Sequence, residues 1–348
     1  MRREPRPRIL PMIVPAVVTI ITAALLQAPP ALADVLLVGN KSAHTAWALD
    51  TETGEKTIWL ETGTGPHEIE VSPDGRYAVV SNYGTRQEPG NSLTVIDWRR
   101  REVVRVIDLG RNSRPHGMAF LPNGSLAVTI EGANSLAIVD IPEGPVRRRI
   151  SVGPGTAHMV AASPDGAVAW VTNIAAGTLE KVDVTAGEVV ATIVTGGGAE
   201  GVAVTPDGTE VWVTNRAADT VSVVDATSLE IVATLASEGV PIRIAFMPDG
   251  ARALVTNARA ATVSVFDVDS RSLLRTIDVA VPEAEYRDTL LGRAALPIGV
   301  EIHPDGRRAF VAVSGGDEVA VIDTTTWRIV DRWPTGREPD ALGVIVSR

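Results

Sequence analysis

The sequence predicts an all-β protein in which seven four-stranded sheets form a ring, a seven-bladed β-propeller. Three observations lead to this fold class. A turn signature recurs about every 42 residues, four short β-rich runs accompany each turn, and seven aspartates each end the third run of a unit. The runs are rich in valine, isoleucine and threonine, which favour strands over helices.

The recurring turn joins a proline to Asp-Gly or Asn-Gly. Proline presets the first turn position and glycine permits a positive φ, so each copy predicts a tight turn between two strands. Successive prolines are 49, 42, 42, 42 and 56 residues apart, which indicates two insertions into a 42-residue unit. The six copies are Pro73-Asp74-Gly75, Pro122-Asn123-Gly124, Pro164-Asp165-Gly166, Pro206-Asp207-Gly208, Pro248-Asp249-Gly250 and Pro304-Asp305-Gly306.

Four strands are predicted around each turn. In one unit they cover residues 201–204, 210–214, 220–224 and 231–235. The aspartate that ends the third strand occurs seven times, which predicts seven blades. These residues are Asp50, Asp97, Asp140, Asp183, Asp225, Asp267 and Asp323.

The two ends of the repeat array are complementary. The array begins at a second strand, residues 35–38, and stops after a first strand, residues 341–346. We therefore expect the last strand to complete the first blade, which would close the ring and leave no open sheet edge. Residues 34–348 would then form one domain, which we expect to be a monomer.

The first 33 residues have the pattern of a secretory signal peptide. Four arginines precede an apolar run over residues 9–26, and Ala31-Leu32-Ala33 supplies a small-residue cleavage site. The run has 18 residues and could instead anchor the chain in a membrane. Pro11 and Pro15 interrupt it, however, so we predict cleavage after Ala33, no remaining membrane span, and a periplasmic or secreted protein.

Composition excludes several classes of function. Removal of residues 1–33 deletes four arginines and one glutamate, which changes the formal charge from −10 to −13. This charge argues against general nucleic-acid binding. The chain has no cysteine, so disulfides, iron–sulfur clusters and covalently attached haem are excluded.

Three repeats carry the same short motif after the turn: Val171-Thr172-Asn173, Val213-Thr214-Asn215 and Val255-Thr256-Asn257. With Val-Asp or Phe-Asp about ten residues later, this pattern resembles the YVTN family of β-propeller repeats. The resemblance implies an exported seven-bladed propeller. It implies little about chemistry, because one fold hosts many functions.

A candidate site follows from propeller architecture, in which the first strand of each blade lines the central channel. The position six residues before the turn proline should lie near one mouth of that channel. Around the ring this position holds Asp340, His67, His116, His158, Glu200, Ile242 and Ile298. Three imidazoles and a carboxylate suit zinc, manganese, copper or iron. The alternative is a set of ordinary polar residues that bond neighbouring carbonyls.

Other residues are predicted at the same face. Arg216 and Arg259 follow second strands and Arg243 follows the Ile242 position, so these cations could receive an acidic ligand. Both insertions, residues 83–92 and 281–296, map to this face and suggest partial cover. The asparagines that end the second strands are expected to bond loop backbone.

Two functions of different classes remain open. The first is a binding or interaction protein that holds a metal ion, a small ligand or a protein partner at this face. The second is a metal-dependent lyase or hydrolase acting on a lactone or an acidic saccharide, with Glu200 or Asp340 as general base. No Gly-x-Ser-x-Gly nucleophile motif is present.

Overall fold

A computed structural model describes residues 1, 4, 33–289 and 291–347. The predicted signal peptide therefore lies outside the described residues apart from positions 1, 4 and 33. Residues 33–348 form one compact unit. Within the described part of the chain, no helix combines the length and apolar composition required to cross a bilayer.

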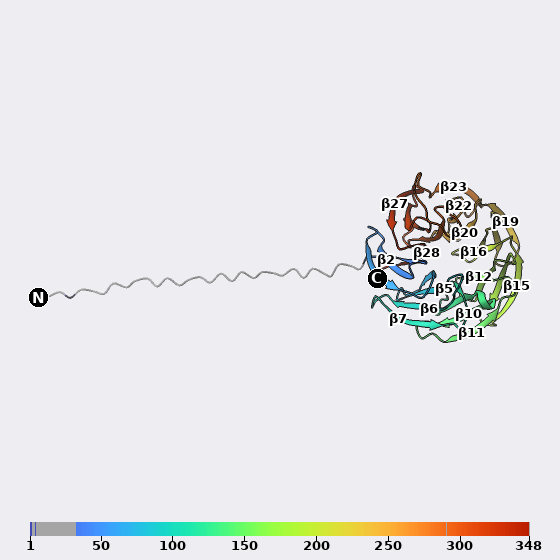
Figure 1. The fold of residues 1–348 in the computed structure, drawn as a ribbon, viewed down its shortest axis with the longest axis horizontal. Coiled ribbons are helices and arrows are strands. Elements are labelled where there is room, and N and C mark those ends of the chain that lie inside the picture. Colours follow the sequence, from blue (N-terminus) through green and yellow to red (C-terminus); the bar gives the residue numbers. More distant parts are fainter. Residues whose placement is uncertain (2–3, 5–32, 290, 348) are drawn as a thin grey trace. The chain divides into compact units, whose positions relative to one another are not determined.

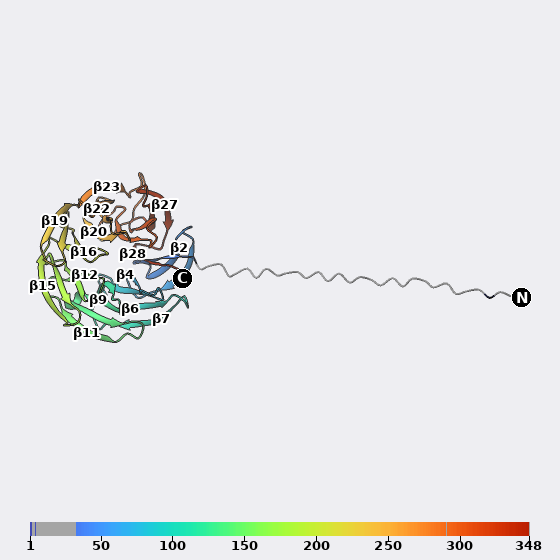
Figure 2. The ribbon, with the colours of Figure 1, turned by 180° about the vertical axis from the view of Figure 1, so that it is seen from behind.

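Seven four-stranded antiparallel sheets are arranged as a ring, as predicted (Figure 1 and, from behind, Figure 2). Strand β28 (Pro339–Ile345) pairs antiparallel with β1 (Val35–Asn40), and Val35 lies opposite Ile345. The last strand thus completes the first blade and leaves no open edge at the junction, which confirms the closure inferred from the sequence.

The strands occupy equivalent places in every blade. The first, channel-lining strands are β28, β4 (Pro66–Val71), β8 (Pro115–Phe120), β12 (Ala157–Ala162), β16 (Ala199–Val204), β20 (Pro241–Phe246) and β24 (Pro297–Ile302). The second strands are β1, β5 (Tyr77–Gly84), β9 (Ser125–Ile130), β13 (Val168–Asn173), β17 (Glu210–Asn215), β21 (Arg252–Asn257) and β25 (Arg308–Val313).

The third strands are β2 (Thr45–Asp50), β6 (Pro89–Asp97), β10 (Ser135–Asp140), β14 (Thr178–Asp183), β18 (Thr220–Asp225), β22 (Thr262–Asp267) and β26 (Glu318–Asp323). The fourth, outermost strands are β3 (Lys56–Glu61), β7 (Glu102–Asp108), β11 (Val146–Ser151), β15 (Glu188–Val194), β19 (Ile231–Ala236), β23 (Ser272–Asp278) and β27 (Arg328–Pro334). A short 3-10 helix, η1 (Glu131–Ala133), follows β9.

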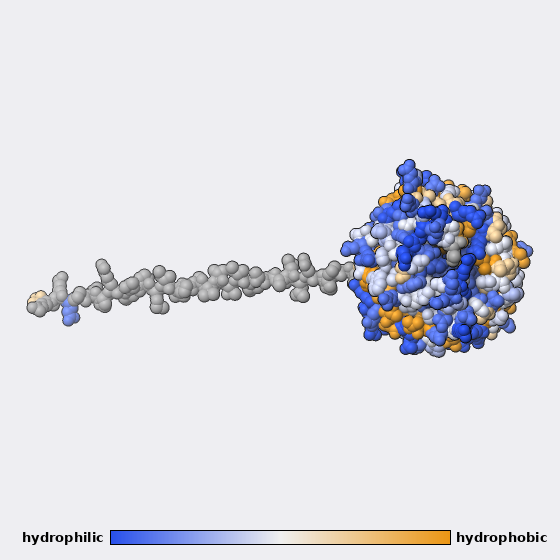
Figure 3. Space-filling model, in the orientation of Figure 1, coloured by the Kyte–Doolittle hydropathy of each residue, from blue (hydrophilic) through white to orange (hydrophobic). Residues whose placement is uncertain are grey.

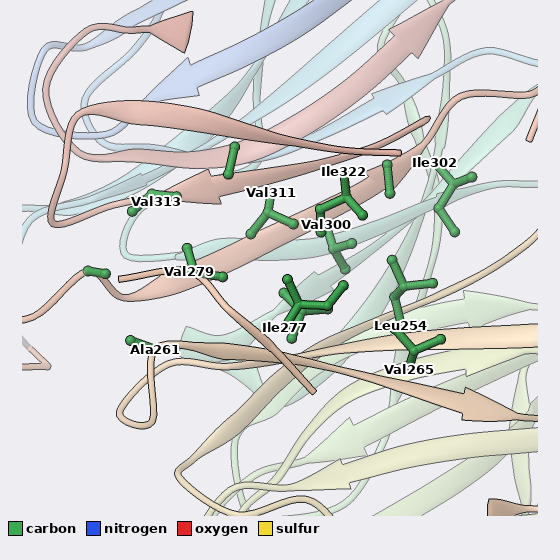
Figure 4. Packing of buried hydrophobic residues seen from close by; sticks show 14 of the residues in the cluster. Leu254, Ala261, Val265, Ile277, Val279, Val300, Ile302, Val311, Val313 and Ile322 are labelled. Carbon is green, nitrogen blue, oxygen red and sulfur yellow. The ribbon is translucent and has the colours of Figure 1, made fainter. Parts of the chain in front are cut away.

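The hydrophobic core lies between neighbouring blades. Second strands are buried on both faces because each sheet is covered by the next one. Figure 4 shows one such cluster, in which Leu254 and Val265 of blade six face Val300 and Val311 of blade seven. Burial of these branched side chains, each worth about 1.5–3 kcal/mol, holds the ring together without disulfides.

The outermost strands have one exposed face. Burial alternates along β15, and the outermost strands carry most of the exposed large hydrophobic residues among the described residues, such as Val106 and Val194. On the face in Figure 3, hydrophobic residues form separate patches near the edge of the molecule. The rest of the face shown is largely polar (Figure 3).

Candidate functional site

Each channel-lining strand contains a β-bulge at the position that the sequence singled out. In blade two, Pro66 lies opposite Asn82 but Ile69 lies opposite Val80, so one extra residue stands between them. The same shift occurs in the other six blades. A bulge redirects side chains, which explains why consecutive residues such as His67 and Glu68 both contribute to the channel site.

The threonine of the repeated motif secures this bulge. The Thr214 hydroxyl accepts a hydrogen bond from the Gly201 N–H of its own blade at 2.7 Å and donates to the Ile242 carbonyl of the next blade at 3.0 Å. Thr172 bonds Met159 and Glu200 in the same way. This hydroxyl therefore fixes the channel-mouth residues of two neighbouring blades relative to each other.

The three predicted histidines meet at the channel mouth. The ring centroids of His67 and His116 are 4.2 Å apart, and those of His116 and His158 are 3.9 Å apart. The side chains of His116 and His158 are only 2% and 9% exposed. Tyr83 packs edge-on against both His67 and His116. The blades are thus close enough for three imidazoles to share one small space.

His158 lies between two carboxylates. Its Nδ1 is 2.7 Å from Glu131 and its Nε2 is 2.8 Å from Glu200. Burial alone would lower its pKa, but the charges and hydrogen bonds of Glu200 and Glu131 outweigh this effect and raise the pKa to about 9. The Tyr83 hydroxyl donates to Glu131 at 2.5 Å and completes a chain of contacts across four blades.

His67 has the opposite electrostatic environment. Burial and the neighbouring charge of Lys41 lower its pKa to about 4, although Asp340 acts in the other direction. Its Nδ1 is 3.2 Å from Asp340 and its Nε2 is 3.2 Å from the Lys41 amine. The imidazole of His67 is therefore neutral at physiological pH.

His116 is the central ring of the three. Neither of its ring nitrogens makes a hydrogen bond to a described residue, and the nearest carboxylate oxygen, on Glu131, is 4.0 Å from Nε2. Burial, together with the charge of His158, lowers its pKa well below the ordinary value. A buried neutral imidazole without a partner is uncommon, because an unsatisfied buried polar group is costly.

Two overlapping groups of potential metal ligands share His116. One consists of His67, Glu68 and His116, and the other of His116, Glu131 and His158. Within each group the ligand atoms lie within 4.8 Å of one another. Metal–ligand bonds of about 2.0–2.2 Å require closer spacing than this upper limit.

The two carboxylates that the sequence nominated are neutralised by cations. Glu200 contacts Arg216 at 2.9 Å and Arg243 at 3.5 Å, and Asp340 contacts Lys41 at 3.0 Å. Burial would raise both pKa values. The charge of His158 nevertheless holds that of Glu200 at about 2, and Lys41 lowers that of Asp340. Carboxylates with such low pKa values are weak general bases.

An ion pair across the channel forms the floor of the site. Arg243 of blade six pairs with Glu68 of blade two, with side chains 9% and 16% exposed. The pair separates an upper cavity of about 290 Å³, which contains the histidines, from a lower channel of about 650 Å³. The lower channel contains Glu70 and Glu301, whose pKa values are raised by burial.

Both insertions contribute to the channel mouth, as predicted. Tyr83 lines the upper cavity from one insertion, and Thr289 and Leu296 line it from the other. The cavity adjoins an outer hollow of about 670 Å³, which we call the vestibule. The vestibule residues are Lys41, Ser42, His44, Gly65, Tyr83, Gly84, Thr85, Arg86, Gln87, Arg114, Asp288, Thr289 and Glu338.

The three predicted ligand-binding arginines do not share one place. Arg216 and Arg243 line the cavity, but each is paired with a carboxylate. Arg259 lies instead in a separate hollow with Asp219 and Glu238. Within the described residues the cavity thus has no arginine left unpaired for an acidic ligand.

Sequence reasoning named Arg216 and the insertion that begins at Tyr83 but missed Lys41 and Glu131 as cavity residues. Lys41, Glu131 and Arg216 directly follow second strands, Tyr83 lies near the end of β5, and all four line the cavity. The same alignment of the repeats would have found them, because each lies one position beyond the place of the motif asparagine. The asparagines themselves are buried and bond neighbouring backbone or side chains, as expected; Asn173, for example, donates to the Val152 carbonyl.

The fold and the cavity together define a seven-bladed β-propeller with an enclosed cluster of histidines and carboxylates at one channel mouth. A family described as YNCE-like beta-propeller matches residues 123–286. This match and the ring of seven blades confirm the YVTN-type propeller predicted from the repeats.

Solved structures show the same fold at low identity. A Kuenenia stuttgartiensis hydrazine synthase chain is 21% identical, with a TM-score of 0.69 over 82% of this chain and 91% of that one. A functionally unknown protein from Desulfotomaculum acetoxidans DSM 771 is 15% identical, with a TM-score of 0.75 over 91% of this chain and 100% of that one. No curated protein matches the chain. These likenesses establish the fold alone.

Proposed function

We propose that this propeller is a binding protein that holds one divalent transition-metal ion at the channel mouth, with His67, His116 and His158 as ligands. The observation that carries the proposal is His116. It is buried between two other imidazoles, and neither of its nitrogens has a hydrogen-bond partner among the described residues. A metal ion would bind one of these nitrogens and offset the free-energy cost of burying it.

The donor set fits such an ion. Neutral imidazole is the ligating form of histidine, and His67 and His116 are already neutral because of their lowered pKa values. Glu131 is the carboxylate placed with His116 and His158. It also bonds His158 Nδ1, an arrangement that orients metal-binding histidines in many proteins. Because the pKa of His158 is raised to about 9, this ring would have to release a proton, and Glu200 would have to move away from its Nε2, for that nitrogen to bind the metal.

The proposal can be tested with the mature protein purified without affinity histidines or chelators. We expect about one equivalent of Zn²⁺ or Co²⁺ to bind, and His116→Ala to weaken binding at least 100-fold. His44→Ala is a matched control because His44 is an exposed histidine outside both ligand groups. Equal binding by His116→Ala and wild type, with unchanged melting temperatures, would refute the site.

We also propose that the protein acts outside the cytoplasm. Support comes from the first 33 residues, which have the charge and apolar pattern of an export signal. N-terminal sequencing of the protein from its native cells should find Asp34 as the first residue. An intact N-terminus would contradict this proposal without affecting the metal site.

A further inference from the structure

The upper cavity has two unlike halves. Its polar half carries the histidines and carboxylates described above. Blades six and seven supply the other half, where the equivalent positions are Ile242 and Ile298. These pack with Ala258 and Leu296 into a buried apolar cluster, in which each residue is at most 6% exposed. The insertion thus adds a leucine to an apolar wall within the cavity that contains the histidines.

The dimensions of the cavity limit what can contact both halves. Its volume is about 290 Å³, and the Arg243–Glu68 pair closes its floor. This is the lower end of the size range of ligand pockets. A ligand must therefore be small, and the adjoining vestibule offers a route of entry.

The vestibule carries cationic groups without a carboxylate partner. Arg114 stacks on the Tyr83 ring and donates to the Thr85 carbonyl at 3.0 Å, but it forms no ion pair with any residue that the structure describes. The Arg86 guanidinium has no hydrogen bond or ion pair with a described residue. Guanidinium groups at an entrance attract anions by their charge. Asp288 and Glu338 also line the vestibule without an ion pair to a described residue, so the entrance is balanced in charge and the preference for an anion comes from the positive charge of the proposed metal ion.

We infer that the cavity binds a short-chain aliphatic carboxylate, with its head toward the metal site and its tail on Ile242, Leu296 and Ile298. This inference rests on the proposed metal site. The metal would accept the carboxylate oxygen, since hard oxygen donors complete many transition-metal sites. The apolar wall would cover the alkyl tail, which explains why the histidine position changes to isoleucine in two adjacent blades.

The test uses the intact mature protein loaded with Co²⁺, whose visible absorption reports coordination. Acetate, butyrate and butylammonium are titrated separately. Each buried methylene should tighten binding about fourfold, so butyrate should bind about 15-fold more tightly than acetate. Ile298→Thr should reduce this ratio several-fold while cobalt stoichiometry stays at one. Val106→Thr, on an outer strand, should leave the ratio unchanged.

The outcomes separate the two proposals. If no Co²⁺ binds, the metal site is refuted and the carboxylate inference fails with it. If Co²⁺ binds but acetate and butyrate bind equally, or butylammonium binds more tightly than butyrate, only the carboxylate inference is overturned. A length preference that Ile298→Thr leaves intact would also overturn it, because the tail would then lie elsewhere.

Discussion

Replacing Arg243 tests whether the ion pair across the channel stabilises the ring. Arg243 is buried between Glu68 and Glu200, and the charges of these carboxylates raise its pKa despite burial. Arg243→Met keeps most of the side-chain length but removes the charge. Glu68 would then be a buried carboxylate without a cation. Breaking a buried pair on one side typically costs about 3–5 kcal/mol, so we expect unfolding free energy to fall by roughly that amount.

Urea unfolding at pH 7.5, followed by tryptophan fluorescence, measures this loss. The double variant Arg243→Met/Glu68→Gln should recover a substantial part of it, because the stranded charge is gone. Arg216→Met is the matched control. Arg216 also pairs with Glu200, but its side chain is 40% exposed, so its loss should cost under about 1 kcal/mol.

The loss should also depend on pH. Burial raises the pKa of Glu68 above its ordinary value of 4.5, and Arg243 opposes this rise. Without Arg243 the folded-state pKa rises further above the unfolded value, so the folded variant keeps a proton that the unfolded chain releases. The penalty therefore grows as pH rises above about 4.5 and should be smaller at pH 5 than at pH 7.5. A loss under about 1 kcal/mol at pH 7.5, or one independent of pH, would refute this reasoning.

Three further predictions concern other parts of the ring. Burial raises the pKa of Glu301 to about 8, so this residue lowers the free energy of unfolding increasingly as the pH rises from 4.5 to 8. Glu301→Gln should therefore stabilise the protein at pH 8 by on the order of 2 kcal/mol, a value reduced because water in the channel screens the Glu301 charge, and it should have little effect near pH 4.5. A stabilisation that stays constant between pH 4.5 and 8 would contradict this prediction. Deletion of residues 339–348 removes β28 and reopens blade one, so cooperative melting at the wild-type temperature would contradict the closure argument. Thr214→Val removes a buried hydroxyl that joins blades five and six, and denaturation should show a loss of about 1–3 kcal/mol, against a negligible loss for the turn variant Thr209→Val.

The sequence alone determined the architecture, because the information for a repeat fold is local. Pro-Asx-Gly turns and valine-rich runs specify each blade, and the position of Val35–Asn40 relative to Pro339–Ile345 predicts the closed ring. The known architecture of propellers, applied to the periodic turns, also identified the channel-mouth position. A residue type that recurs at one offset in a regular ring recurs at equivalent places in neighbouring blades, so His67, His116 and His158 could be assigned to one mouth of the channel without coordinates.

Only the tertiary structure decided the electrostatics of the site. Sequence offers no means of seeing that Arg243 and Glu68, 175 residues apart, meet across the channel. Nor does it show that His158 lies between two carboxylates while His116 has no hydrogen-bond partner within the described part of the chain. These contacts depend on distances between blades and on the bulges that redirect side chains. They set the charge of each group through burial and close neighbours, which is why Glu200 and Asp340, plausible bases by sequence, have low pKa values in the folded ring.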